Sequence, residues 1–390
     1  MAQQHLEPTD PTAGLTGDAL AGYLRAQATE FLRALRLHRE TGGSSNGAGA
    51  GSGSEEAVDA ARALRRSARR ISGSLHTFRP LLDPDWAEAI RPELAWLSGT
   101  LAMEHAYSGR LERLLLALHR LSGAPVFPGQ SAQTAGGSNR STGAAVGSSA
   151  DVAAGSRAAG AAPVPKKAAH TDAGPPSGQP TERGNLTVGA AKAGALLERQ
   201  LTLARTRAHS TALQALGSSR FHAVADHIAV LASDVPLTPT APTADLRPLA
   251  AAAEERLTDA IAALPLVTAG CPYNAEALIH GLSPDPAPHP QDAPWHQVRL
   301  LLRLHRYALE VLHGEKAPVD ARLLTAGQAL NRHRDASEAA AAAAAAARTP
   351  RIAPATAYAL GVLHADQRHE VEAARFTFQQ SWQKQAVGTA

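Results

Sequence analysis

The sequence predicts an all-α protein built as two pseudo-symmetric antiparallel helical bundles that share a basic groove. Hydrophobic residues make up 44% of the chain but aromatic residues only 4%, so the core is expected to consist of Leu, Ala and Val, which suits helices better than sheets. Apolar residues recur every three or four positions, and no useful stretch alternates apolar with polar residues. Two basic helical segments with the same spacing lie far apart in the sequence.

The segment 295–312, WHQVRLLLRLHRYALEVL, carries the clearer of the two basic patterns. A helix of 3.6 residues per turn places four donors on one stripe, namely His296, Arg299, Arg303 and Arg306. The leucines and Val298 fall largely on the other side and can pack into a core. Almost no acid interrupts the stripe before Glu310, which leaves the donors available to an external anion.

The segment 57–80 repeats this pattern in the first half of the chain. Its spacing of three and then four residues is carried by Arg62, Arg65 and Arg69, and the face is widened by Arg66 and Arg70. Five cations within about two and a half turns repel one another, and the nearest acid is Asp59. A polyanion would relieve this repulsion, so the pattern favours an anion-binding face.

The other elements follow from helical periodicity and from Gly and Pro breaks. Helices are expected over residues 15–40, 57–80, 186–216, 219–233, 246–264, 295–312, 321–348 and 356–385, with two helices between 86 and 121. Residues 266–294 are expected to be irregular, and the last segment to form one or two helices. The alanine run 339–347 favours a helix but offers little to pack against.

Composition divides the chain into four parts. Residues 1–14 are expected to be disordered, 15–122 to form the first helical half, and 186–386 the second. Between them, 123–185 consists of Gly, Ser, Ala, Pro and Thr with almost no large apolar residue, so it is expected to be disordered. A shorter Gly/Ser tether is expected at 41–54.

The overall charge is nearly balanced, since 38 basic and 35 acidic residues leave a formal net charge of +3. A basic site must therefore arise from clustering. Cys271 is the single cysteine, which excludes an intrachain disulfide and a thiolate metal cluster. The start of the sequence lacks a signal-peptide pattern, and no apolar run approaches membrane length, so a cytoplasmic protein without membrane contact is expected.

Motifs for catalysis are missing from the sequence. His222 with Asp226 and His227, and His364 with His369, are not standard metal-ligand sets, and HExxH does not occur. A GxSxG elbow and a P-loop are likewise missing. We therefore expect no catalytic residues, no metal and no cofactor, and the protein is not expected to be an enzyme.

The pattern H-x2-R-x3-[KR]-x2-R-Y, formed by His296, Arg299, Arg303, Arg306 and Tyr307, resembles the second signature helix of the CHAD family (conserved histidine α-helical domain). The stretch 56–83, which ends in HTFRPLLD, resembles the first signature helix. Other segments match the family in order and spacing over most of the chain. The resemblance implies an all-α fold that binds inorganic polyphosphate and associates with polyphosphate granules.

Several positions depart from the family pattern. Arg62 stands where the family has a histidine, and Ser72 replaces an arginine. Residues 104–107 read EHAY in place of the usual Ala-Arg-Asp-Leu, and Leu301 and Leu304 occupy positions that are often basic in relatives. Arg62 keeps a hydrogen-bond donor, whereas the other changes lower the expected charge density.

We interpret the protein as a non-catalytic binder of inorganic polyphosphate. The expected contacts are Arg62, Arg65, Arg66, Arg69, Arg70, His296, Arg299, Arg303 and Arg306, with Arg25, His76, Arg79, Tyr307 and His333 as further candidates. A nucleic-acid binder is an alternative, although the basic helices lack aromatic platforms for bases. A phosphohydrolase or kinase would need carboxylates for Mg²⁺ beside the arginines, and the basic helices supply none. A scaffold with a partly decayed phosphate site is a further alternative.

Overall fold

The computed structural model describes residues 16–43, 52–123, 180–271, 274–282, 289–314 and 320–383. Regular structure in these ranges is helical, apart from one isolated antiparallel bridge between Leu82 and Leu237. The all-α prediction is thereby confirmed. The expectations of disorder at 1–14, over most of the 41–54 tether and over most of the 123–185 insert concern residues outside the described ranges.

The long helices, in chain order, are α1 (Gly17–Gly43), α2 (Ser52–Thr77), α3 (Pro84–Ser122), α4 (Pro180–Leu216), α5 (Ser219–Ser233), α6 (Arg247–Ala262), α9 (Ala293–His313), α10 (Ala321–Ala347) and α11 (Pro354–Gln383). The short elements are α7 (Leu266–Ala269), α8 (Ala275–Gly281) and the 3-10 turns η1 (Arg79–Leu81), η2 (Ala241–Thr243) and η3 (Pro290–Asp292). None of the helices in the described ranges has the length and apolarity needed to cross a membrane.

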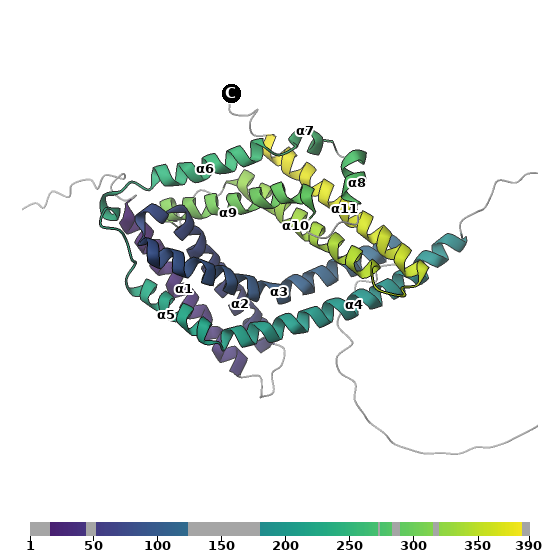
Figure 1. Ribbon diagram of the computed structural model, residues 1–390, viewed down its shortest axis with the longest axis horizontal. Coiled ribbons are helices and arrows are strands. Elements are labelled where there is room, and N and C mark those ends of the chain that lie inside the picture. The colour runs from purple at the N-terminus through teal and green to yellow at the C-terminus, as the bar shows by residue number, and fades with distance from the viewer. Residues whose placement is uncertain are drawn as a thin grey trace, which may run out of the picture.

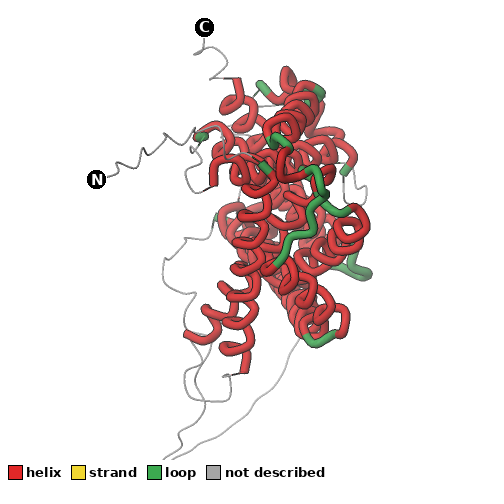
Figure 2. Tube along the Cα trace, turned by 90° about the vertical axis from the view of Figure 1, so that its left-hand side faces the viewer, coloured by secondary structure: helices red, strands yellow, loops and turns green. Residues whose placement is uncertain are grey.

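The helices run along the sides of an elongated frame (Figure 1). Helices α6 and α9 follow one side, α10 and α11 the next, and α3 and α4 a third, while α1, α2 and α5 close the remaining end. The second view shows that helices make up most of the described part (Figure 2). The two basic helices, α2 and α9, contact each other directly.

Three hydrophobic clusters hold the frame together. The first joins α1, α2, the start of α3 and α5 with the C-terminal part of α9. The second joins the end of α3 with α4, α10 and α11, and the third joins α6 with the first turns of α9 and α10 and with Phe378. The first two clusters contain residues from both of the halves expected from the sequence, so burial does not separate the halves, and that division stays a prediction.

The pair of helices expected between 86 and 121 is a single helix, α3, of 39 residues. Asp83 caps its start by accepting a hydrogen bond from the backbone N–H of Trp86, and Gly123 ends it with φ 66°. Leu94 and Leu97 lie in the first cluster, whereas Leu114 and Leu118 lie in the second. Because the buried stripe is interrupted between the two clusters, one helix has the apolar pattern of two.

Other expectations also need correction. The alanine run packs well, since Ala339, Ala340, Ala343 and Ala346 are buried. Their small side chains fit where α10 lies against its neighbours α11, α3 and α4. Helix α4 begins at Pro180, so 180–185 belong to a helix that adjoins the insert. The segment 266–294 contains α7 and α8 in addition to irregular chain.

Candidate anion-binding site

The two basic helices are held together by close packing at Gly73. A Cβ atom at this position would lie 2.5 Å from Cδ2 of Tyr307 and 3.3 Å from Cδ2 of Leu304. The apolar faces of both helices turn into the core, with Leu64 and Ile71 of α2 and Val298 of α9 almost fully buried. This packing leaves the basic faces of α2 and α9 directed toward a common region.

Five arginines from three helices meet in this region, and we call them the arginine cluster: Arg65 and Arg69 from α2, Arg299 and Arg303 from α9, and Arg334 from α10. Each side chain is partly buried. Burial and the charges of Arg303 and Arg65 lower the pKa of Arg69 to about 10. Burial and the charges of Arg303, Arg334 and Arg69 lower the pKa of Arg299 to about 9. The guanidinium groups therefore act on one another across the helices.

The positive charges of the arginine cluster are only partly balanced by neighbouring carboxylates. Arg299 donates to Oδ1 of Asn331 at 2.8 Å. Arg334 pairs with Asp335 at 2.7 Å and approaches Glu338 at 3.5 Å. Among the described residues, no carboxylate lies within ion-pair distance of the other three members, Arg65, Arg69 and Arg303. Partly buried cations without counter-ions are unfavourable, and an external anion would remove the penalty.

Three predicted contacts lie at the edge of the arginine cluster. Arg66 and Arg306 are exposed, and their charges act on Arg65 and Arg303 respectively. Arg62 is also exposed and forms an i,i+3 ion pair with Asp59 at 3.0 Å. Such surface pairs are weak, so Arg62 remains available to a ligand.

Arg70 has a structural partner. Its Nε donates to Oε2 of Glu310 at 2.8 Å, and the hydroxyl of Tyr23 donates to the same oxygen at 3.0 Å. Although burial lowers the pKa of Arg70, its hydrogen bond and charge interaction with Glu310 raise it overall. Arg70 therefore joins α2 to α9 and α1, and its charge is already neutralised.

His296 lies beside the arginine cluster. Burial lowers its pKa, as do the charges of Arg299 and Arg334, while Asp292 and Glu338 act in the opposite direction. Its Nε2 is buried without a hydrogen-bond partner among the described residues. Because His296 lies next to Arg299 and Arg334, its charge when protonated would add to theirs in attracting an anion.

His333 lies beneath this surface with 1% of its area exposed. Its ring stacks on Trp295 and meets His296 edge to face at 5.5 Å between ring centroids. Arg375 donates its Nε–H to Nε2 of His333 at 3.3 Å. The structure therefore places His333 in the core, below His296, where it supports the site without being exposed to a ligand.

A buried ionic network lies below the two histidines. Asp292, which is fully buried, accepts from Arg368 at 2.8 Å, from Arg375 at 2.7 Å, and from the hydroxyl of Ser337. Burial alone would raise the pKa of Asp292, but the hydrogen bonds and charge of Arg368, supported by His333 and Ser337, lower it to about 2. Because Asp292 immediately precedes α9, the network fixes the start of this helix to α10 and α11.

The remaining candidates lie elsewhere. Arg25 is exposed on α1 and does not appear among the charges that act on the arginine cluster. His76 and Arg79 line a separate cavity at the end of α2. The ring of Tyr307 packs on Gly73, and burial raises its pKa although Arg303, Arg70 and Arg69 act to lower it.

Sequence reasoning missed Arg334 and Asn331. Both belong to the NRHRD segment, in which only His333 was singled out. A helical projection separates Arg334 and Asn331 from His333, because residues three apart share a face and adjacent residues do not. That projection would therefore have identified Arg334 and Asn331 as residues on a different face of the helix from His333. The described residues contain no group of three His, Cys, Asp or Glu side chains able to hold a metal ion.

The matching family model is the CHAD domain, which covers residues 26–321. The protein is therefore a member of the CHAD family. Its structure is similar to that of PptA from Streptomyces chartreusis, with 64% sequence identity and a TM-score of 0.68 over 94% of this chain and 99% of that chain. A comparison with curated protein sequences found no match. The family model ends before Arg334, so α10 adds this cluster member from outside the matched residues.

Proposed function

We propose that the arginine cluster binds inorganic polyphosphate without chemical change to the ligand. The observation that carries this proposal is the meeting of Arg65, Arg69 and Arg303, partly buried and without a described counter-ion, on two helices far apart in the sequence. Planar guanidinium forks suit phosphoryl oxygens. Membership of the CHAD family supports this function.

Polyphosphate fits this surface better than other phosphate polymers. It carries negative charge at every unit, offers non-bridging oxygens to successive forks, and has no base edges to recognise. In this proposal α2 and α9 are the equivalent basic helices of two pseudo-symmetric halves, each of which lines one side of a shared groove. Binding of granular polyphosphate would then bring the protein to polyphosphate granules.

Two observations favour this function over the alternatives. Near the arginine cluster, Asp335 pairs with Arg334 and Glu338 pairs with Arg110, so these carboxylates are not free to hold Mg²⁺ beside a phosphate. Among the aromatic residues of α2 and α9, Tyr307 acts on the cluster, but its ring is packed against Gly73 and offers no platform for a nucleobase.

Calorimetric titration of the protein with long-chain polyphosphate tests the proposal. We expect tight binding that weakens by roughly tenfold or more as salt rises from about 50 to about 200 mM, because the contacts are electrostatic. RNA of equal total charge should compete poorly. Equal competition by RNA would favour a nucleic-acid binder, Mg²⁺-dependent release of phosphate would indicate an enzyme, and an absence of binding would favour a scaffold.

The affinity should depend on pH through His296. In the unbound protein, burial and the charges of Arg299 and Arg334 hold the pKa of His296 below its usual value of 6.5, and a bound polyanion raises it. Protonation and binding therefore favour each other, so the affinity should rise as pH falls through about 6.5 and below. Titrations at several pH values should show this rise in the wild type and a smaller rise in His296→Gln. Equal pH dependence in both proteins would contradict the role of His296.

A further inference from the structure

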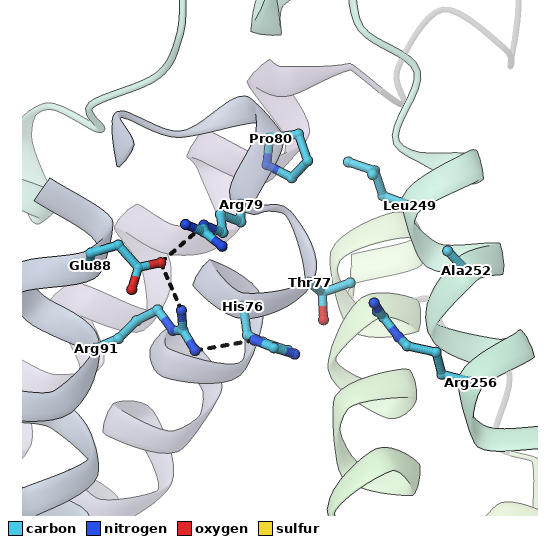
Figure 3. Close-up of a pocket in the computed structure, with 9 residues that line it drawn as sticks. All are labelled: His76, Thr77, Arg79, Pro80, Glu88, Arg91, Leu249, Ala252 and Arg256. Carbon is cyan, nitrogen blue, oxygen red and sulfur yellow. Dashed lines mark hydrogen bonds and ion pairs between the residues drawn. The ribbon is translucent and has the colours of Figure 1, made fainter. Parts of the chain in front are cut away.

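A second basic site lies at the C-terminal end of α2. A cavity of about 410 Å³ opens between this end, η1, the first turns of α3 and the middle of α6. Residues from all four elements line it (Figure 3). Neither the arginine cluster nor His296 contributes to its lining.

The cavity carries more positive than negative charge. Arg79 and Arg91 share a single oxygen of Glu88, at 3.0 Å and 3.1 Å. No described carboxylate lies within ion-pair distance of the third guanidinium, that of Arg256. Three guanidinium groups thus face one carboxylate. Nη2 of Arg91 donates to Nδ1 of His76 at 3.2 Å, because a guanidinium has no acceptor; the neutral imidazole then carries its proton on Nε2 and adds a further donor.

Thr77 supplies an independent indication of a ligand. Only 5% of this residue is exposed, and its Oγ1 has no hydrogen-bond partner among the described residues. A buried hydroxyl without a partner is unfavourable. In Figure 3 the hydroxyl faces the space into which His76 and Arg256 also point. An anion oxygen in that space would accept from all three side chains.

The cavity is distinct from the arginine cluster. Gly73 lies between Arg69 and His76 along α2, and it is the point at which α2 meets Tyr307 and Leu304 of α9. The same stretch of α2 is joined to α9 by the ion pair between Arg70 and Glu310. These contacts close the surface between the two groups of basic residues.

We propose that this cavity binds a phosphoryl dianion of orthophosphate or pyrophosphate size. Arg256 faces Thr77 and His76 across one part of the cavity, while Arg79 and Arg91 line the other part beside Glu88, so an anion in the cavity would lie among cationic donors from three elements. Pro80 and Leu249 form apolar parts of the lining. Two ligands carry such a phosphoryl group: free pyrophosphate, and a polyphosphate chain at its terminal phosphate.

Pyrophosphate titration of a cluster-deficient parent tests this site separately from the arginine cluster. The parent is the full chain with Arg299→Ala, Arg303→Ala and Arg306→Ala. We expect it to bind one pyrophosphate, with affinity reduced about tenfold or more by Arg256→Ala and reduced by Thr77→Val. Arg207→Ala, which removes an exposed arginine from α4, serves as the matched control and should change nothing.

The result that overturns the proposal is an absence of pyrophosphate binding by the folded parent, or binding that Arg256→Ala leaves unchanged. Since Arg256 is exposed, its replacement is expected to preserve the fold even if Thr77→Val does not. Competition between short polyphosphates and bound pyrophosphate identifies which of the two ligands the site takes. Displacement by chains with free ends but not by end-capped chains assigns the site to chain termini, and displacement by neither assigns it to free pyrophosphate.

Discussion

Replacement of Arg299, Arg303 and Arg306 by Ala should weaken polyphosphate binding by roughly a thousandfold. Each charge-assisted contact to a phosphate is worth about 1.5–3 kcal/mol, and every 1.4 kcal/mol corresponds to about a tenfold change in affinity. The three residues form the α9 side of the proposed site and its edge. Calorimetric titration of wild type and variant at the same salt concentration measures the loss.

A matched variant separates site chemistry from net charge. Arg36 and Arg39 on α1 and Arg207 on α4 are exposed, and their joint replacement by Ala removes the same three charges from elsewhere. We expect this control to bind with nearly wild-type affinity. Similar losses in the two variants would mean that overall charge, and not the arginine cluster, governs binding.

The α9 variant should also remain folded. Burial and neighbouring cations lower the pKa values of Arg299 and Arg303, so both charges oppose folding when no ligand is bound. Thermal unfolding without polyphosphate should therefore occur at the wild-type temperature or above it. A site that gains ligand affinity at the expense of stability behaves in this way.

Asp292→Asn should produce the largest change in stability, a loss of about 3–5 kcal/mol in the free energy of unfolding. The substitution leaves Arg368 and Arg375, each more than nine-tenths buried, without the carboxylate that both contact. Removing one partner of a buried ionic group is strongly destabilising because the other charges stay buried. Urea denaturation of the two proteins measures the difference.

An exposed aspartate provides the control. Asp259 lies on the surface of α6, and Asp259→Asn should leave the urea midpoint nearly unchanged. If Asp292→Asn were equally mild, the network would not be fixing the start of α9. The position of His296 should also depend on the network, so the Asp292 variant is expected to bind polyphosphate less tightly even under conditions where it is folded.

The lowered pKa of Asp292 predicts that the wild-type protein loses stability in acid. The pKa of Asp292 is about 2 in the folded protein, against 3.8 for the unperturbed group. Because the folded value is the lower one, the stabilisation is fully present above pH ~4 and is lost as the pH falls toward ~2. A difference of this size corresponds to about 2 kcal/mol, and Asp292→Asn should lack this part of the pH dependence.

Helical periodicity was sufficient for much of the fold. The bounds expected for α5, 219–233, match the structure, in which Ser218 caps the start of the helix and the Pro-containing stretch VPLTPT follows its end. It was insufficient for α3, whose buried stripe passes from one cluster to another. The pairing of Tyr23 and Arg70 with Glu310 joins residues far apart in the sequence, and local spacing carries no information about such contacts.

The site residues were likewise predictable where they lie on one helix and not where they depend on packing between helices. The stripes on α2 and α9 were visible as spacing, since each lies on one helix. The contribution of α10 depended on how a third helix packs against them, and Arg334 was missed for that reason. His333 illustrates the converse, because its position next to two arginines in the sequence suggested a surface role, whereas the fold turns it inward against Trp295.

A polyphosphate titration of the variant that combines Arg65→Ala with Arg69→Ala decides whether α2 and α9 form one polyphosphate site. Neither residue lies on the α9 signature helix, and no described carboxylate lies within ion-pair distance of either. Loss of this α2 pair should weaken binding by about a hundredfold, as should replacement of Arg299 and Arg303. Wild-type affinity in the α2 variant would contradict the claim and would confine binding to α9.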